Sequence, residues 1–219
     1  MDSRERSFLD QMQTLHASGG DLNAHASVAG WGAPLFHAAY RGWCASIEFL
    51  CTHGADVNGK DGGWTPLQRA AFSGHYDAAV LLLDAGARVD DQDRGGSTAL
   101  HLAAARQGYI NMCQLLLSRG ASLDARNQGG EDPEAIARRN NHPATADFLA
   151  AVRAAGGWWG FVDAQAAPQR RALLVLRRAL PALRARRAAT PWNAPHLYYV
   201  LFVDVPEDAF TAIFAYWSA

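Results

Sequence analysis

The sequence predicts an all-α protein: a solenoid of stacked helix-turn-helix units with loops that project from one side. Two observations support this prediction. A short motif recurs at a nearly constant step, and each copy is followed by an apolar run that ends in Gly-Ala. A period of roughly 20 to 50 residues indicates units that bury their apolar faces only by stacking on one another.

The recurring motif is Thr65-Pro66-Leu67, which returns as Thr98-Ala99-Leu100 after 33 residues. Ala33-Pro34-Leu35 precedes it by 32 residues. Each copy continues with an alanine pair and a glycine, and then closes with a polar segment. These closing segments are Asp56-Val57-Asn58, Arg88-Val89-Asp90 and Ser122-Leu123-Asp124. Because three tandem copies agree at many positions, chance is a poor explanation.

The middle copy shows how a first helix forms in each unit. Thr65 can cap the helix with its hydroxyl, and Pro66 suits the first turn because its missing N–H costs nothing there. The pair Ala70-Ala71 has little bulk, so another helix can approach closely. Gly74 then ends the helix. We therefore assign Thr65 a structural role and not a catalytic one.

A second helix is expected from Tyr76 to Ala85, with Gly86 as its left-handed stop. Its expected apolar side consists of Val80, Leu82 and Leu83. Turns rich in Asp, Asn and Gly follow the copies, at residues 58–63, 90–96 and 124–130.

The ends of the array are expected to be incomplete repeats. Phe8, Met12 and Leu15 fit the second helix of a half repeat, and residues 131–137 and 143–152 fit the two helices of a degenerate copy. The predicted domains are a repeat domain at 1–153 and, at 154–219, a helical C-terminal extension rich in aromatic residues and arginine. The repeat domain is expected to consist of a half repeat (3–29), three repeats (30–61, 62–93, 94–127) and a degenerate capping repeat (128–153).

These residues resemble the ankyrin repeat, whose pattern is Gly-x-Thr-Pro-Leu-His-x-Ala-Ala, later Leu-Leu-x-x-Gly-Ala and then Asp-Val-Asn. The resemblance covers roughly residues 5 to 152. It implies an ankyrin solenoid that binds proteins through its loop tips and the exposed side of the inner helices, a rigid concave surface. The implied partner-binding residues are Trp31, Tyr40, Arg41, Trp64, Phe72, Ser73, Arg94, Ser97, Arg106 and Gln107.

Four residues have roles that the resemblance leaves to be tested. The family uses a histidine at the position of His101 to hydrogen-bond between repeats, and His75 is also expected to be structural. Gln68 stands where the family has this histidine, so we expect its repeat to lack one inter-repeat hydrogen bond. Trp64 either faces a partner or folds against Trp31 or beneath the C-terminal extension.

Asn58 is a candidate hydroxylation site. Leu50 precedes it by eight residues, a spacing that resembles the preference of asparaginyl hydroxylases that act on ankyrin repeats. Leu15 and Asn23 repeat the spacing. The ordinary ankyrin pattern produces the same spacing, so a purely structural role is the alternative.

The C-terminal extension contains two expected helices. Residues 170–187 form a basic amphipathic pattern interrupted at Pro181, and residues 204–217 place apolar side chains on one face. These helices either pack on the repeats or bind a partner helix, an acidic surface or a membrane surface. Residues 205–217 also resemble the opening helix of an F-box, and residues 173–217 are similar in length and placement to a SOCS box that lacks its cysteine. Both similarities imply an alternative function, a substrate-recognition adaptor of a ubiquitin ligase.

Composition and missing motifs exclude several classes. A formal net charge of −1 predicts no binding to nucleic acid, and no apolar run is long enough for membrane insertion. We expect an intracellular protein, cytoplasmic or nuclear, with three reduced cysteines, and monomeric apart from its protein partner. The histidines and cysteines lack metal-ligand spacing, and no phosphate loop or nucleophile motif occurs. We therefore predict no enzyme activity, no cofactor and no metal.

Overall fold

The computed structural model describes residues 2–23 and 32–165. Within these ranges the secondary structure is helical, which confirms the all-α class. The labelled helices are α1 (Ser3–Ala17), α2 (Pro34–Arg41), α3 (Cys44–Thr52), α4 (Pro66–Ser73), α5 (Tyr76–Asp84), α6 (Ala99–Ala104), α7 (Ile110–Ser118), α8 (Pro133–Arg139) and α9 (Pro143–Ala154), and residues 158–165 are helical as well. The contacts divide the chain after Trp158, and the following paragraphs concern the part before that point.

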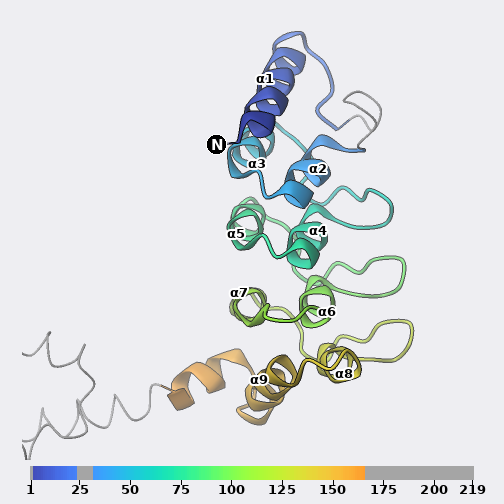
Figure 1. Cartoon of the computed structure of the whole chain (residues 1–219), viewed down its shortest axis with the longest axis vertical. Helices are drawn as coiled ribbons and strands as arrows, with labels where there is room; N and C mark the ends of the chain where they lie inside the picture. Colours follow the sequence, from blue (N-terminus) through green and yellow to red (C-terminus); the bar gives the residue numbers. More distant parts are fainter. Residues whose placement is uncertain (1, 24–31, 166–219) are drawn as a thin grey trace, which may run out of the picture. The chain divides into compact units, whose positions relative to one another are not determined.

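The helices stand in two columns (Figure 1). The inner helices α2, α4, α6 and α8 pack on one another in that order, and the outer helices α1, α3, α5, α7 and α9 do the same. Each inner helix also packs on the outer helix that follows it in the chain. The loops between repeats project from the side of the inner helices (Figure 1). Each repeat is therefore a helix pair followed by a projecting loop.

The start of α4 confirms the predicted capping. The Thr65 hydroxyl accepts a hydrogen bond from the Gln68 N–H at 3.2 Å, and the Gln68 side-chain oxygen accepts one from the Thr65 N–H at 2.8 Å. This is a capping box, which satisfies two helix-end donors at once. Ala70 and Ala71 are fully buried, as the close approach of neighbouring helices requires.

Glycines at the ends of the inner helices admit side chains of the next repeat. Gly42 has φ +68°, and a Cβ there would lie 2.6 Å from the ring of His75. His75 in turn donates from Nε2 to the carbonyl of Tyr40 at 2.9 Å. Tyr109 covers Gly74 in the same way and donates to the Ser73 carbonyl. His75 is thus structural, as predicted.

Gln68 corrects one sequence prediction. Its amide nitrogen donates to the carbonyl oxygens of Asp91, at 2.8 Å, and Ser97, at 2.9 Å, both in the loop after α5. The repeat has therefore not lost an inter-repeat hydrogen bond. The prediction was wrong because a primary amide supplies one acceptor and two donors, so it replaces an imidazole and adds a bond. His101, as expected, bonds across the boundary, from Nε2 to the Glu131 carbonyl at 3.1 Å.

The buried side of α5 differs from the predicted one. Leu82 is fully buried, but its companions are Ala78 and Ala79, whereas Val80 and Leu83 are only partly buried. At 100° per residue, positions 78, 79 and 82 fall on one side of the helix and position 80 falls opposite. The outer helix therefore buries small residues where we expected bulky ones.

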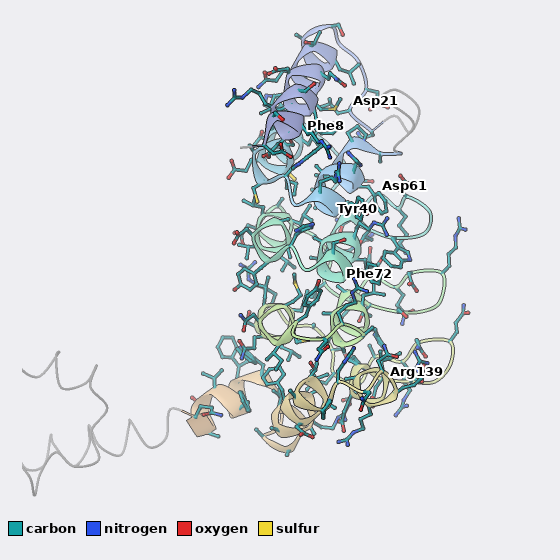
Figure 2. The ribbon with its side chains drawn as sticks, in the orientation of Figure 1. Phe8, Asp21, Tyr40, Asp61, Phe72 and Arg139 are labelled. Carbon is teal, nitrogen blue, oxygen red and sulfur yellow. The ribbon has the colours of Figure 1, made fainter. Side chains whose placement is uncertain are left out.

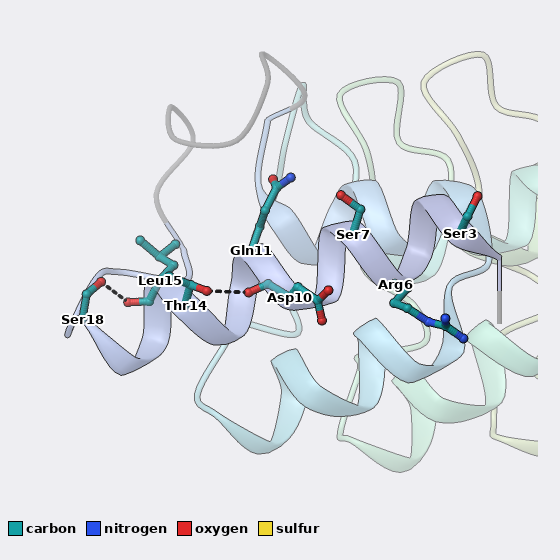
Figure 3. A pocket seen from close by; sticks show the side chains of 8 residues that line it. All are labelled: Ser3, Arg6, Ser7, Asp10, Gln11, Thr14, Leu15 and Ser18. Atoms are coloured by element: carbon teal, nitrogen blue, oxygen red, sulfur yellow. Dashed lines mark hydrogen bonds between the residues drawn. The ribbon is translucent and has the colours of Figure 1, made fainter.

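The N-terminal helix closes one end of the stack. α1 buries Phe8 and Met12, and the Glu5 carboxylate accepts hydrogen bonds from the N–H groups of Ala45 and Ser46 at the start of α3. Its other face is polar and borders a shallow depression of about 720 Å³ (Figure 3). A polar outer face is what the terminal unit of a solenoid needs in water.

Ion pairs of Arg153 stabilise the other end. Arg153 of α9 reaches Asp132 at 3.1 Å, and it also contacts Glu134. Asp132 additionally caps α8 by accepting from the N–H of Ala135 at 2.8 Å, in the place where the two preceding repeats have Thr65 and Thr98. The predicted helices at 131–137 and 143–152 are thus present as α8 and α9.

Other predictions fall on residues 24–31 and 166–219, which lie outside the described residues. They concern Trp31, the helices at 170–187 and 204–217, and the F-box and SOCS-box similarities. Among the helices that the structure does describe, none has both the length and the apolar composition needed to cross a bilayer.

Candidate partner-binding site

Arg69 lies among three aromatic rings on the inner helices. It extends from α4, and its guanidinium carbon is 4.5 Å from the ring centre of Tyr40 and 5.2 Å from that of Phe36, both in α2 of the preceding repeat. The Trp64 ring, in the loop before α4, lies 5.4 Å away. Each such contact contributes about 0.5 to 1 kcal/mol at an exposed site, and more where water is excluded. Together the three rings hold the guanidinium in a fixed position.

The stacking continues toward the third repeat. Trp64 and Phe72 meet edge to face, with ring centres 5.2 Å apart, and the guanidinium of Arg106 lies 4.5 Å from the Phe72 ring centre. Tyr40 and Phe72 come from successive inner helices (Figure 2). We call this set the ring–guanidinium row; its members are Phe36, Tyr40, Trp64, Arg69, Phe72 and Arg106.

The row is accessible to solvent. Tyr40 is 40% exposed, Arg106 is exposed, and the other members are partly buried. Arg69 is the exception at one atom, since its Nε is buried and has no hydrogen-bond partner among the described residues. Its two terminal nitrogens form no hydrogen bond within the described residues and are not fully buried. A partner can therefore reach them more readily than Nε.

The positive charges of the row have no acidic partners. Neither Arg69 nor Arg106 forms an ion pair within residues 2–23 and 32–165, whereas Arg88, Arg119, Arg138, Arg139 and Arg153 all do. Two aspartates of the nearby loops accept backbone hydrogen bonds: Asp61 from Ala33, and Asp93 from Gly95 and Ser97. This surface is thus aromatic and cationic, and neither of its two arginines is in an ion pair with a described residue.

The structure brings together four of the predicted partner-binding residues: Tyr40, Trp64, Phe72 and Arg106. The alternative prediction, that Trp64 folds against Trp31 or beneath the C-terminal extension, concerns residues outside the described ranges. Within those ranges the Trp64 ring contacts Phe72 and Arg69.

The remaining predicted residues lie around the row or apart from it. The Arg41 guanidinium lies over Trp43 at 5.5 Å, and the Ser73 hydroxyl is buried. The Ser97 carbonyl is occupied by Gln68. Arg94 and Gln107 are exposed, and the stem of Arg94 lies close to Gly63.

Sequence reasoning missed Phe36 and Arg69. Both follow a Pro-Leu pair within an inner helix, where the aligned residues of the other repeats include buried histidines. The only available signal was the helical spacing of Arg69, three residues before Phe72 and five after Trp64. That spacing places Arg69 and Phe72 on neighbouring parts of the helix surface, but it shows neither the contact with Trp64 nor that with α2.

Asn58 has a structural role in the folded chain. Its side chain accepts a hydrogen bond from the Arg88 N–H at 2.8 Å and donates to the Gly86 carbonyl. Asn23 makes the same pair of bonds to Asp56 and Gly54. The two asparagines therefore join successive loops. Hydroxylation of Asn58 stays a prediction, which mass spectrometry of the native protein tests.

The titratable groups do not form a reactive centre. Burial raises the pKa of the Cys51 thiol to about 11 and that of Cys113 to about 12, so both are protonated and poorly nucleophilic at neutral pH. Burial, with a smaller effect of Arg41, lowers the pKa of His37. Within the described residues, no three His, Cys, Asp or Glu side chains gather as a metal site would require.

Helix pairs stacked in two columns, with projecting loops and an open inner surface, define a repeat protein of the solenoid class. The sequence matches two families of ankyrin repeats, one over residues 4–93 and the other over residues 70–117. Residues 4–117 therefore consist of ankyrin repeats, and the chain belongs to the ankyrin-repeat proteins. Ankyrin repeats are protein-interaction modules.

Three relatives illustrate the similarity. A probable 26S proteasome regulatory subunit, p28, from Saccharomyces cerevisiae is 46% identical over 77 residues, 34% of each chain. Dauer abnormal formation protein 25 of Caenorhabditis elegans is 45% identical over 72 residues, 32% of this chain and 19% of the relative. Ankyrin repeat and SOCS box protein 16 of Mus musculus is 34% identical over 73 residues, 33% of this chain and 16% of the relative. The match thus spans about a third or less of each relative.

Proposed function

We propose that this chain is a non-catalytic interaction module that binds a partner protein through the ring–guanidinium row and the adjoining loops. One observation supports the proposal above others: aromatic rings, and guanidinium groups without an ion pair among the described residues, form a continuous and partly exposed stack over three repeats. Tyr, Trp and Arg are the residue types that most often dominate binding energy at protein interfaces.

The stacking also lowers the cost of binding. A free arginine side chain loses rotamer freedom when a partner immobilises it, at a cost of roughly 0.5 to 1.5 kcal/mol. Arg69 and Arg106 already lie against rings, so much of that freedom is lost during folding. The inner helices that position the rings pack on one another along the stack. A partner therefore meets an ordered surface.

The test compares captured proteins between matched variants. The Trp64→Ala, Arg94→Ala double variant removes a ring of the row and the exposed arginine in the following loop. A control variant, Tyr76→Ala with Arg119→Ala, removes an exposed ring and an arginine from the outer column. Quantitative mass spectrometry of affinity captures should show partners held by wild type and control but lost from the row variant. Partners retained equally by all three proteins would refute the assignment of this surface.

A second candidate function is that of a substrate-recognition adaptor of a ubiquitin ligase. One observation favours it: the name of a mouse relative includes a SOCS box. The recruiting segment would lie in residues 154–219, beyond the family matches, which end at residue 117. Deleting residues 154–219 tests this candidate. If the truncated chain stays folded and the isolated segment captures ligase components, the adaptor gains support. If the truncated chain unfolds, the segment is part of the fold, and nothing then supports the adaptor function.

A further inference from the structure

We infer that the ring–guanidinium row takes an acidic protein segment, one carboxylate of which pairs with the guanidinium of Arg69. This inference rests on the proposed function and adds the chemistry of the partner. It follows from the geometry of Arg69, from its missing counter-ion and from the charge beside it.

The two ends of the Arg69 guanidinium differ in burial. The Nε atom is buried, while the two terminal nitrogens are not fully buried and form no hydrogen bond within the described residues. The rings of Phe36, Tyr40 and Trp64 restrict the remaining approach. What remains is a fork of N–H donors, whose spacing matches the two oxygens of a carboxylate.

The surroundings of Arg69 make such pairing favourable. Aromatic rings replace part of the water around the charge, and no acid among the described residues compensates it. Partial removal of water strengthens the attraction to an incoming opposite charge. The rings already restrict the rotamers of Arg69 in the free protein, so binding costs less side-chain entropy. An anion that binds here therefore gains more than it would at a fully solvated arginine.

The neighbouring part of the row indicates more than one contact. Arg106 lies over Phe72, next to Trp64, and also has no ion pair within the described residues. A segment that carries a second carboxylate near Arg106, with an apolar side chain over Trp64 and Phe72, complements both properties of the surface. A guanidinium edge pairs bidentately with a carboxylate and with a phosphate alike. We propose the carboxylate, which an unmodified protein segment supplies, and the experiment below separates the two anions.

A peptide selection provides the probe. A phage library of random 12-residue peptides is selected on the full-length chain, and the enriched peptides are synthesised. Affinities are measured by calorimetry for each peptide and for analogues with Asp→Asn or Glu→Gln at single positions. The same titrations are run on Arg69→Gln and on a control, Arg119→Gln, which removes an equal charge at the end of the outer helix α7. Thermal unfolding by circular dichroism confirms that each variant is folded.

The expected result is a coupling between one peptide carboxylate and Arg69. Replacing that acid should weaken binding to wild type and to Arg119→Gln by at least about tenfold, and to Arg69→Gln by less than about twofold. The coupling should shrink in high salt, as expected for charges that are partly solvated.

Other outcomes separate the two claims. If peptides lose affinity for a Trp64→Ala, Phe72→Ala variant but show no coupling to Arg69, the inference is wrong and the proposed function stands. If phosphoserine analogues bind more tightly than the carboxylate peptides in an Arg69-dependent way, the carboxylate assignment is overturned. If the selected peptides are indifferent to Trp64 and Phe72, or if no peptide is enriched, the proposed function fails as well.

Discussion

The side-chain amide of Gln68 donates a hydrogen bond of 2.9 Å to the backbone carbonyl of Ser97, and so joins the inner helix of one repeat to the loop that leads into the next. The same side chain bonds to the Asp91 carbonyl and caps its own helix. Because the residue is 1% exposed, water does not replace these bonds when they are lost. The stability of the stack should therefore depend strongly on this one polar residue.

Replacing Gln68 with alanine should lower the free energy of unfolding by about 2 to 4 kcal/mol. The Thr65 N–H and the Asp91 carbonyl lose their partner, and the Ser97 carbonyl loses one of its two donors, keeping the Asp93 N–H. Urea denaturation of the full chain measures the change. The control is Gln92→Ala, whose side chain is exposed and makes one long bond of 3.4 Å; we expect a loss below about 0.5 kcal/mol. Equal losses in the two variants would show that the inter-repeat bonds of Gln68 contribute little.

His101 should make stability fall in mild acid. Its pKa in the folded protein is lowered below 6.5, mainly by burial, so the unfolded chain takes up the proton first. Neutral His101 thus contributes fully to the free energy of unfolding above pH 6.5. This contribution is lost as the pH falls from 6.5 toward the folded-state pKa, by at most about 1.4 kcal/mol per pH unit.

The variant His101→Gln isolates this effect, because Gln68 shows that glutamine suits the same position in a repeat. We expect the variant to lose less stability than wild type between pH 7 and pH 5.5. Urea denaturation at several pH values provides the measurement. Parallel curves for the two proteins would mean that His101 does not contribute to acid sensitivity.

The contact between Tyr40 and Arg69 should be measurable as a coupling energy. In a double-mutant cycle of Tyr40→Leu with Arg69→Gln, we expect about 0.5 to 1 kcal/mol of coupling in the free energy of unfolding. The matched cycle uses Tyr76→Leu, which removes a ring of similar exposure on α5. That cycle should give a coupling near zero. A coupling no larger for Tyr40 than for Tyr76 would contradict the stacked arrangement.

The buried cysteines should resist alkylation while the chain is folded. With a pKa near 12, the Cys113 thiol is almost entirely protonated at pH 8, and its position in the core excludes reagent. Labelling with iodoacetamide, followed by mass spectrometry of peptides, should show Cys113 reacting far more slowly than Cys44, which is only partly buried. In urea the rates should converge. Rapid labelling of Cys113 in the native chain would contradict the packing of α7.

The repeated features of this fold were predictable from the sequence because they are local. The capping by Thr65 and the stop at Gly74 depend on a few neighbouring residues, and three copies of the pattern reinforce each other. Glu5 was not predictable, since the helix end that it caps lies 40 residues further along the chain. For Gln68, the family pattern suggested a loss, whereas the chemistry of an amide allows a gain.

The candidate site was predictable only in part, for the same reason. Tyr40, Trp64 and Phe72 could be recognised as exposed aromatic residues at positions that the repeat presents. Arg69 is the residue that joins them, and its role depends on rings from α2 and from the loop before α4. No local pattern records a contact between two repeats, so the structure was needed to find it.

The central claim is that a partner contacts the inner helices and the loop before α4. Hydrogen exchange of the full chain, with and without a selected acidic peptide, tests this claim most directly. The account predicts slower exchange in residues 34–41 and 58–73 of the complex, with little change in the outer helices at 76–84 and 110–118. Protection confined to the outer helices, with none in α2, α4 or the loop between repeats, would contradict the account.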